Sequence, residues 1–366
     1  MAINRRQFIV GASQVAIATW LLPACTNLKP EQWIVSTCND QSGQTMAAAL
    51  DSKGQIINTV NLPARGHDSL ALPHKPGHAL VFARRPGSFA VEVDFSSGTI
   101  VKQIQSQADS HFYGHGVFSS DFKYLYTTEN LYDKKRGLIV VRDAQTYQVL
   151  ERYESGGIGP HELALMPDKQ TIVIANGGIE THPNQHRKKL NIETMQPNLA
   201  YLDLKTGQIL GSYQPPDHQL SLRHLDVAEN GTVYVGAQYQ GHKSKLQPLL
   251  YSHQGENLLR AFQADQAQWH KMQQYTASVL VKDSLLCVSC PRGAHLSYWD
   301  TQSHRFTYQQ KMRDVSGLAK TNKQIYASTG RGQLTALLDD EILTKQQSQH
   351  SLDIKFDNHM TIINGA

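Results

Sequence analysis

Histidines recur at the starts of short apolar runs along this chain of 366 residues, which contains 17 histidines in all. The recurring positions carry His67, His115, His161, His224 and His359. Neutral imidazole is a good ligand for copper, zinc, iron and nickel, so histidines that meet from separate segments could hold a transition metal. Glu162 and Arg223 adjoin two of them and could support the site, the carboxylate also as a ligand. Such histidines can equally bond to neighbouring backbone or bind an anion or another small ligand, and the residue types alone leave these alternatives open.

Short β-strands are the elements that must position these histidines. Apolar runs such as HALVFAR, YLYTTE, TIVIAN and TVYVGAQY are rich in Val, Ile, Tyr and Thr. Gly, Pro, Asp and Asn bound these runs, which is the pattern of strands joined by turns. The best helical candidate is a polar piece at residues 263–274. The sequence therefore predicts an all-β fold.

Two repeated features interleave along the chain, and each occurs seven times. The first is a polar, mostly acidic turn after a strand, at positions 51, 94, 143, 203, 253, 300 and 339. The second is the start of an apolar strand, at positions 67, 115, 161, 224, 278, 317 and 359, spaced 39 to 63 residues apart. A repeat of about 40–50 residues with four strands is typical of a β-propeller, so we predict seven blades. No acidic turn follows the last strand start, which predicts that a C-terminal innermost strand closes the ring by pairing with N-terminal strands.

A propeller would bring the five histidines together, because the first strand of each blade lines the central channel. Loops between the second and third strands of each blade should lie on the face of the propeller where the first strands begin. The polar residues expected above the channel are Arg84, Arg85, Glu129, Asn176, Glu180, Arg292 and Arg331, with Arg223 beside the histidines. Because a guanidinium group matches the oxygens of a carboxylate or phosphate, this set predicts an anionic ligand; the alternative is salt bridging between blades.

The N-terminus has the pattern of an export signal. NRRQF at residues 4–8 resembles a twin-arginine motif, and an apolar stretch at roughly residues 8–22 is too short to span a bilayer comfortably. LPAC at residues 22–25 resembles a lipoprotein cleavage box with Cys25 as the acylated residue, although its proline is unusual and a non-lipidated signal is the alternative. We predict a signal at residues 1–24, a linker at 25–32 and one propeller at 33–366. The protein would lie in the periplasm, anchored to the membrane only by the lipid on Cys25, or soluble there.

Composition and motifs argue against several other classes. The formal net charge is only +4, so we expect no nucleic-acid partner. Cys287 and Cys290 form a CxxC pattern within the run LLCVSC, but alternation along a strand would put them on opposite faces, which argues against a redox or zinc motif. No G-x-S-x-G sequence occurs, so nucleophilic catalysis has no candidate of that kind.

Several long motifs resemble those of an exported bacterial family described as domain of unknown function 1513. They are HFYGHGVFSSDFKYLYTTEN, GGIGPHELALMPD, ANGGIETHPN, LNIETMQPNLAYLD, LRHL, AQYQG and CPRG, and the similarity runs from about residue 31 to the C-terminus. The resemblance implies a seven-bladed propeller related to quinoprotein-amine-dehydrogenase-like and YVTN-type repeats. Members tend to be encoded beside imelysin-type iron-uptake lipoproteins and di-haem peroxidase-like oxidoreductases. These are then the expected partners, in periplasmic iron or other metal handling.

The leading hypothesis is therefore a periplasmic propeller that binds iron or copper, as an ion or a complex, through its channel histidines and Glu162 in metal acquisition. One alternative is a metal-dependent enzyme, a lactonase or an oxidoreductase, that uses the same funnel. The other is a protein-interaction scaffold in which the histidines are structural.

Overall fold

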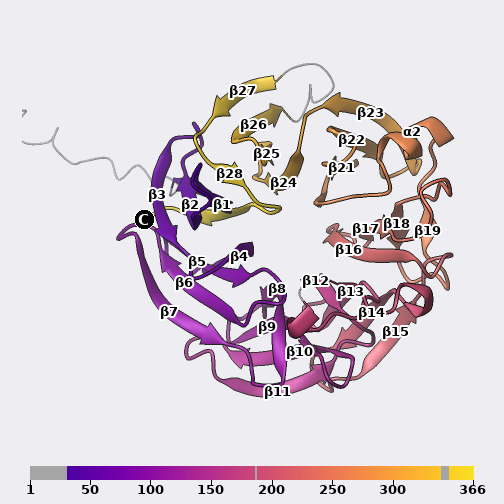
Figure 1. The fold of residues 1–366 in the computed structure, drawn as a ribbon, viewed down its shortest axis with the longest axis horizontal. Helices are drawn as coiled ribbons and strands as arrows, with labels where there is room; N and C mark the ends of the chain where they lie inside the picture. Colours follow the sequence, from indigo (N-terminus) through magenta and orange to yellow (C-terminus); the bar gives the residue numbers. More distant parts are fainter. Residues whose placement is uncertain (1–30, 186–187, 339–345) are drawn as a thin grey trace, which may run out of the picture. The chain divides into compact units, whose positions relative to one another are not determined.

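Seven antiparallel sheets are arranged in a ring in the computed structural model, which describes residues 31–185, 188–338 and 346–366 (Figure 1). Six sheets each take four consecutive strands, and the seventh combines strands from both ends of the unit Gln32–Ala366. We name the sheets blades A to G in the order in which their first strands occur. This arrangement confirms the predicted all-β, seven-bladed propeller.

The strands of each blade have the following bounds. Blade A contains β1 (Gln32–Asn39), β2 (Thr45–Leu50), β3 (Ile56–Asn61), β28 (Lys355–Phe356) and β29 (Thr361–Asn364). Blade B contains β4 (Gly66–Ala71), β5 (His78–Ala83), β6 (Phe89–Asp94) and β7 (Thr99–Gln105), and blade C contains β8 (Ser110–Phe118), β9 (Tyr124–Leu131), β10 (Arg136–Asp143) and β11 (Val149–Glu154). Blade D contains β12 (Pro160–Leu165), β13 (Thr171–Asn176), β14 (Asn198–Asp203) and β15 (Ile209–Tyr213), and blade E contains β16 (Leu220–Val227), β17 (Val233–Tyr239), β18 (Leu250–His253) and β19 (Arg260–Ala261). Blade F contains β20 (Val279–Lys282), β21 (Leu285–Cys290), β22 (His295–Asp300) and β23 (Arg305–Lys311), and blade G contains β24 (Val315–Lys320), β25 (Gln324–Thr329), β26 (Gln333–Leu338) and β27 (Gln346–Ser351).

Helical structure in the described residues is short. It consists of α2 (Gln266–Lys271), η1 (Pro183–Gln185) and η2 (Ile192–Thr194). The helix α2 lies inside the polar piece at residues 263–274 where the sequence predicted one. No helix in the described part of the chain is long and apolar enough to cross a membrane. The predicted signal and Cys25 lie outside the described residues.

The two ends of the propeller close the ring within blade A. The C-terminal strand β29 pairs antiparallel with β1, and Ile363 lies opposite Trp33 in this register. Further out, β1 continues to β2 and β3. The closure by a C-terminal innermost strand on N-terminal strands therefore follows the prediction.

The hydrophobic core lies between the blades, because the two middle strands of each blade have neighbours on both faces. Alternation along β1 shows this plainly: Ile34 packs in a cluster with blade G, whereas Val35 packs in a cluster with blade B. Alternation also separates Cys287, which packs between blades F and G, from Cys290, which packs between blades E and F. Both thiols are free and buried, so the CxxC pattern forms no joint site.

Acidic turns between the outer strands fix the blade edges. The side chains that accept backbone N–H bonds within these turns are Asp51, Asp94, Asp143, Asp203 and Asp300. At three of them a glycine with positive φ completes the turn, which a residue with a Cβ would do at a cost in strain: Gly54, Gly98 and Gly207. Of the two remaining positions, 253 carries His253, and 339 lies outside the described residues.

Replacement of Ile363 by Ala should test the closure. The side chain is 2% exposed and packs between blades A and B, so its truncation is expected to lower the free energy of unfolding by about 2–5 kcal/mol. Urea denaturation of the purified protein would measure this change. The control is Leu258→Ala, because Leu258 is 75% exposed and its loss should change stability by no more than about 0.5 kcal/mol. Equal stability of the two variants would contradict a role of β29 in closing the ring.

Candidate metal centre

Four histidines of the predicted group lie where an innermost strand is irregular. Pairing with the second strand of the blade is interrupted between Gly66 and Ser69 in β4, Phe112 and Gly116 in β8, Pro160 and Leu163 in β12, and Leu222 and Leu225 in β16. Inside these interruptions lie His67, His115, His161 and His224. A bulge bends its strand and redirects a side chain that regular alternation would point elsewhere. The same distortion, repeated in four consecutive blades, thus directs four imidazoles to one place.

The fifth histidine comes from the C-terminal segment that closes the ring. His359 lies between β28 and β29, which both pair with β1. Residues 357–360 leave the pairing there, opposite Ser36 and Thr37. The Ser36 hydroxyl donates a 2.6 Å hydrogen bond to the His359 carbonyl and holds the interruption in place. Blade A therefore supplies its histidine by the same kind of break as blades B to E.

The five imidazoles contact one another in a closed cycle, which we call the histidine ring. Centroid distances between successive members are 4.9 Å for His67–His115, 4.9 Å for His115–His161, 4.5 Å for His161–His224, 4.6 Å for His224–His359 and 4.7 Å for His359–His67. Each of the five residues is at most 7% exposed. The structure therefore brings together all five histidines that the spacing singled out.

Several nitrogens of the histidine ring have no hydrogen-bond partner within the described part of the chain. They are Nδ1 of His67, Nε2 of His115, Nδ1 of His161 and Nε2 of His359. Two triplets have ligand atoms that all lie within 4.8 Å of one another: His67, His115 and His161, and His115, His224 and His359. A metal ion would satisfy such converging lone pairs, so these residues fit a nitrogen-ligated transition metal.

Two carboxylates each bond to one histidine of the ring. Asp68 Oδ2 lies 2.9 Å from His115 Nδ1, and Glu162 Oε2 lies 3.0 Å from His224 Nδ1. Glu162 also accepts a 3.1 Å bond from the backbone N–H of Leu225. A carboxylate on Nδ1 fixes the tautomer and leaves Nε2 for a metal, as in carboxylate–histidine–metal arrangements. Glu162 thus serves as a support of His224 here, one of the two roles that the sequence left open.

Asp68 was missed by the sequence reasoning, although a signal for it exists. An acid directly follows the histidine in blade B, as Asp68 follows His67, and again in blade D, as Glu162 follows His161. Each acid bonds to the histidine of the next blade rather than to its neighbour in sequence.

Burial and mutual repulsion keep most of the ring uncharged. The pKa values of His67, His161 and His224 lie well below the usual value. Burial is the main cause, and the charges of neighbouring histidines and arginines add to it. Burial likewise lowers the pKa of His359. Burial opposes protonation of His115 too, but the charge of Asp68 and the hydrogen bond to it outweigh this effect and raise its pKa. Four imidazoles therefore stay in the neutral form that ligates metals.

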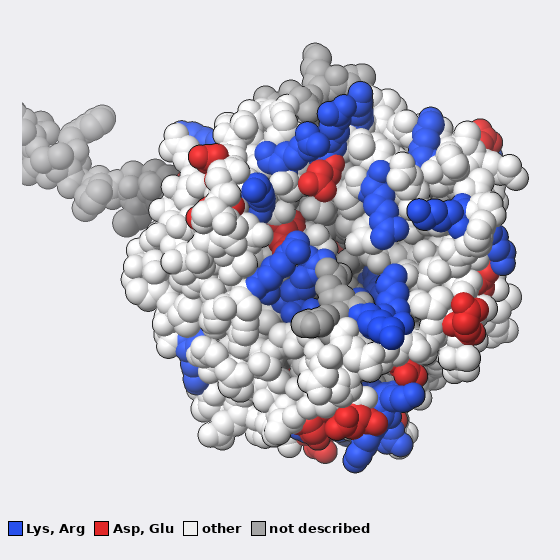
Figure 2. All heavy atoms as spheres, in the orientation of Figure 1, with Lys and Arg blue, Asp and Glu red and all other residues white. Residues whose placement is uncertain are grey.

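A cavity of about 40 Å³ adjoins the ring and carries cationic groups. Its lining includes three members of the ring together with Arg84, Arg85 and Arg223. Arg84 forms a 3.1 Å ion pair with Asp357, and the Arg85 guanidinium lies 5.4 Å from the ring centroid of Tyr113. Lys and Arg side chains also gather around the centre of the face of the ring shown in Figure 2. Three of the arginines expected beside the histidines therefore lie there.

The other five residues expected above the channel are not part of this lining. Glu129 lies within β9, where it is fully buried and accepts bonds from Arg142 and Ser110. Asn176 is the last residue of β13 and bonds to Ser155 and Asn198. Neither side chain lies above the channel as expected, because hydrogen bonds to neighbouring residues of the propeller already occupy it.

The remaining three predicted residues lie on the loops but make other contacts. Glu180 pairs with Lys135 at 3.0 Å, and the Arg292 guanidinium stacks over Tyr275 at 4.2 Å from the ring centroid. Arg331 is exposed.

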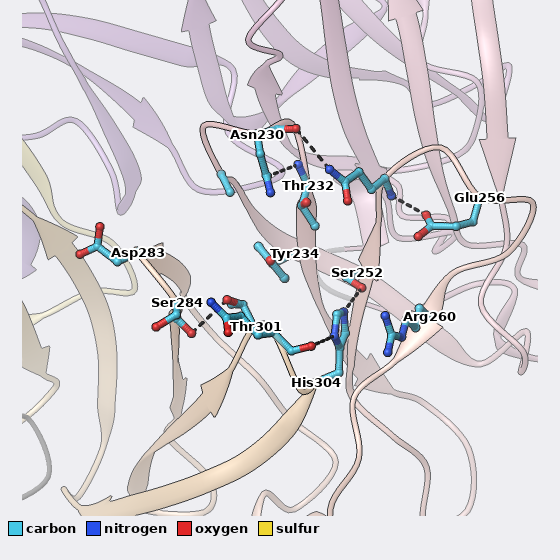
Figure 3. Close-up of a pocket in the computed structure, with 13 residues that line it drawn as sticks. Asn230, Thr232, Tyr234, Ser252, Glu256, Arg260, Asp283, Ser284, Thr301 and His304 are labelled. Carbon is cyan, nitrogen blue, oxygen red and sulfur yellow. Dashed lines mark hydrogen bonds between the residues drawn. The ribbon is translucent and has the colours of Figure 1, made fainter.

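A second pocket, of about 330 Å³, lies between blades E and F and contains a serine–histidine contact (Figure 3). Ser252 Oγ lies 2.8 Å from His304 Nε2, and the other ring nitrogen of His304 faces the carbonyl of Gln302 at 3.5 Å. Within the described residues no carboxylate bonds to this imidazole, and Ser252 is 3% exposed. The pair therefore joins two blades and lacks the orienting acid of a catalytic triad.

Comparisons with known proteins agree with this fold. The family described as protein of unknown function (DUF1513) matches residues 60–363. No curated protein matches the sequence at a significant level. Among solved structures, Kuenenia stuttgartiensis hydrazine synthase superposes with a TM-score of 0.61 at 13% identity, over 82% of this chain and 90% of that one. At this identity the likeness shows the fold alone.

Replacement of Gly114 by Ala should displace the histidine ring. Gly114 has φ +105°, and a Cβ there would lie 2.4 Å from Cδ2 of His67. We expect about 1–2 kcal/mol of backbone strain and roughly 1–3 kcal/mol more from the clash, with shifted ring resonances of His67 in histidine NMR spectra. Gly43→Ala is the matched control, because Gly43 has φ +92° with nothing within 4 Å of the added Cβ. If both variants lose the same stability and the His67 signals do not move, the close packing described here is wrong.

Proposed function

The chain belongs to the DUF1513 family, and we propose that its function is to bind a transition metal ion in the channel through the histidine ring. The observation that carries the proposal is the set of buried, converging ring nitrogens without a hydrogen bond in the described residues. An unsatisfied buried polar atom costs about 1–3 kcal/mol. Several such nitrogens in one place therefore destabilise the empty site, and a bound metal ion would remove this cost.

A structural histidine in the same protein supports this interpretation by contrast. Nδ1 of His253 lies 2.6 Å from the Tyr201 hydroxyl, and its Nε2 lies 2.8 Å from the Glu256 carbonyl. Both nitrogens of this buried imidazole are therefore satisfied by the protein itself. Four members of the histidine ring instead have one nitrogen without a hydrogen-bond partner in the described residues, as His115 does with Nε2 while Asp68 holds its Nδ1.

The donor set favours metals that accept imidazole. Nitrogen ligands suit copper, zinc, nickel and iron, whereas calcium and magnesium prefer oxygen. We propose iron or copper, as an ion or a complex, because the family resemblance connects the chain to iron and metal handling. Asp68 and Glu162 would orient His115 and His224 and offset the positive charge of the ion.

Metal analysis of the purified protein tests the proposal. We expect one ion per chain by mass spectrometry, and we expect His115→Ala and His224→Ala each to weaken binding by roughly 100-fold or more, since loss of a supporting group alone costs about 10–100-fold. Equilibrium titration with Cu²⁺ and Fe²⁺ would measure the change. His74→Ala is the control, because this exposed histidine lies outside the ring. Wild-type protein that retains no ion, or ring variants that bind like wild type, would rule the function out.

We also propose that the protein acts in the periplasm, with Cys25 as its lipid anchor, beside an imelysin-type lipoprotein and a di-haem oxidoreductase. The twin-arginine pattern and the cleavage box support export, and the family resemblance supports the partners. An exported metal-binding propeller would meet its ion before the ion crosses the inner membrane.

Replacement of Cys25 by Ser tests the anchor. Without a thiol to acylate, the chain should move from the membrane fraction to the soluble periplasmic fraction, as immunoblots of fractionated cells would show. Cys38→Ser is the control, because Cys38 is buried in the propeller. Wild-type protein found entirely in the soluble fraction would contradict lipidation.

A further inference from the structure

The cavity beside the histidine ring has the electrostatics of an anion site. Arg84, Arg85 and Arg223 contribute to its lining, and no Asp or Glu does so among the described residues. Arg84 pairs with Asp357, and the same carboxylate also pairs with Arg65. Two anionic supports of the ring, Asp68 and Glu162, are likewise not part of the lining. The charged side chains in the lining are thus all cationic.

Chain order accounts for this separation of charge. Arg223 comes directly before His224, whereas the acids come directly after His67 and His161. Innermost strands of a propeller all run the same way through the channel, so position in the strand becomes depth along the axis. Arg223 therefore precedes its histidine along the axis, whereas Asp68 and Glu162 follow theirs.

The packing around Arg223 indicates a preformed site, because a buried guanidinium group requires space that the neighbouring backbone must leave open. Arg223 is 3% exposed. A Cβ at Gly177 would come within 3.2 Å of its guanidinium carbon, so the absence of a side chain there admits Arg223. The Ser221 hydroxyl donates a 2.7 Å bond to the Gly177 carbonyl and fixes this stretch of backbone beside it.

The volume limits what the cavity can hold. Because one water needs about 10–15 Å³ of such space, a cavity of about 40 Å³ holds roughly three to four non-hydrogen atoms. A carboxylate group or a carbonate ion has about this size, and its oxygens match the fork of a guanidinium group. A tetrahedral sulfate or phosphate is larger.

We propose that this cavity binds a small planar oxyanion of the carboxylate or carbonate class beside the histidine ring. The role of that anion as a co-ligand of the metal rests on the proposed function, because the lining includes His67, His161 and His224. The anion would offset the charge that a metal adds to the arginines. The chain would then take up a metal together with its anion.

Formate, bicarbonate and sulfate are the probes for a calorimetric test on the purified, metal-free protein. Formate or bicarbonate should bind, and sulfate should bind at least about tenfold more weakly. Arg223→Gln should weaken formate binding by about tenfold or more, the size expected for the loss of a charge-assisted hydrogen bond. Arg85→Gln, a half-buried position, is the second variant in case Arg223→Gln fails to fold, which thermal melting would reveal. Arg152→Gln on the outer strand β11 is the control and should bind like wild type.

The same protein loaded with Cu²⁺ separates the two proposals. Formate should shift the visible absorption band of the bound copper and tighten its binding by about tenfold. A chain that binds Cu²⁺ but is indifferent to formate in both forms would overturn the anion site and leave the metal function standing. Arg223-dependent formate binding by a chain that retains no metal would overturn the metal function and leave the anion site. Equal binding of sulfate and formate, or wild-type affinity in both arginine variants, would also overturn the anion site.

Discussion

Closure of seven blades around a narrow axis is the constraint on which the rest of the structure depends. The innermost strands approach so closely that imidazoles from neighbouring blades lie in ring-to-ring contact, with centroids 4.5 Å apart for His161 and His224. Polar groups at such positions are cut off from water, and each must find a partner inside the channel. On the side of blades F and G the partners are serine hydroxyls and backbone carbonyls, as where Ser289 donates to the carbonyl of Ser316 at 2.7 Å. On the side of blades A to E the histidine ring takes their place, and four of its nitrogens have no hydrogen-bond partner among the described residues. The proposed function rests on that difference.

A cluster of five imidazoles would repel itself if it were protonated, and the fold prevents this in two ways. Burial removes the water that would stabilise the charged form, and each neighbour that gains a proton lowers the pKa of the next. The exception is His115, whose pKa the Asp68 carboxylate raises. The same carboxylate would stabilise the positive charge that a metal places on His115. Asp68 and Glu162 thus bond to the histidine ring, while Arg84, Arg85 and Arg223 line the cavity beside it, so a cation and an anion could be held side by side.

Much of this could be predicted from the sequence, because a propeller repeats its features. Seven strand starts at similar spacing gave the number of blades, and the histidines among them gave the ring. The pairing of Asp68 with His115 could not be predicted, since it joins successive blades and depends on the bulge at His115. Glu129 failed as a ligand candidate for a related reason. Strand ends depend on pairing, and β9 continues through Glu129 to Leu131, where Arg142 from the next strand occupies the carboxylate.

Ring closure and completion of the site are one event in this chain. Residues 357–360, the C-terminal segment that leaves the pairing with β1, carry His359 into the channel. Small residues of blades F and G make room for this segment and hold it: Ser278 donates to the carbonyl of Asn358 at 3.1 Å, and Ser316 to that of Asp357 at 3.3 Å. The Asp357 carboxylate in turn holds Arg84 at the cavity. A propeller that had not yet closed would therefore lack one imidazole of the ring and the carboxylate that pairs with Arg84 and Arg65. Because a ligand that binds only the closed form stabilises that form, a metal held by His359 together with histidines from blades B to E would fasten the ring at its seam. The innermost strands of blades F and G, β20 and β24, contain no histidine, and this leaves the space in which the C-terminal segment enters and completes the centre.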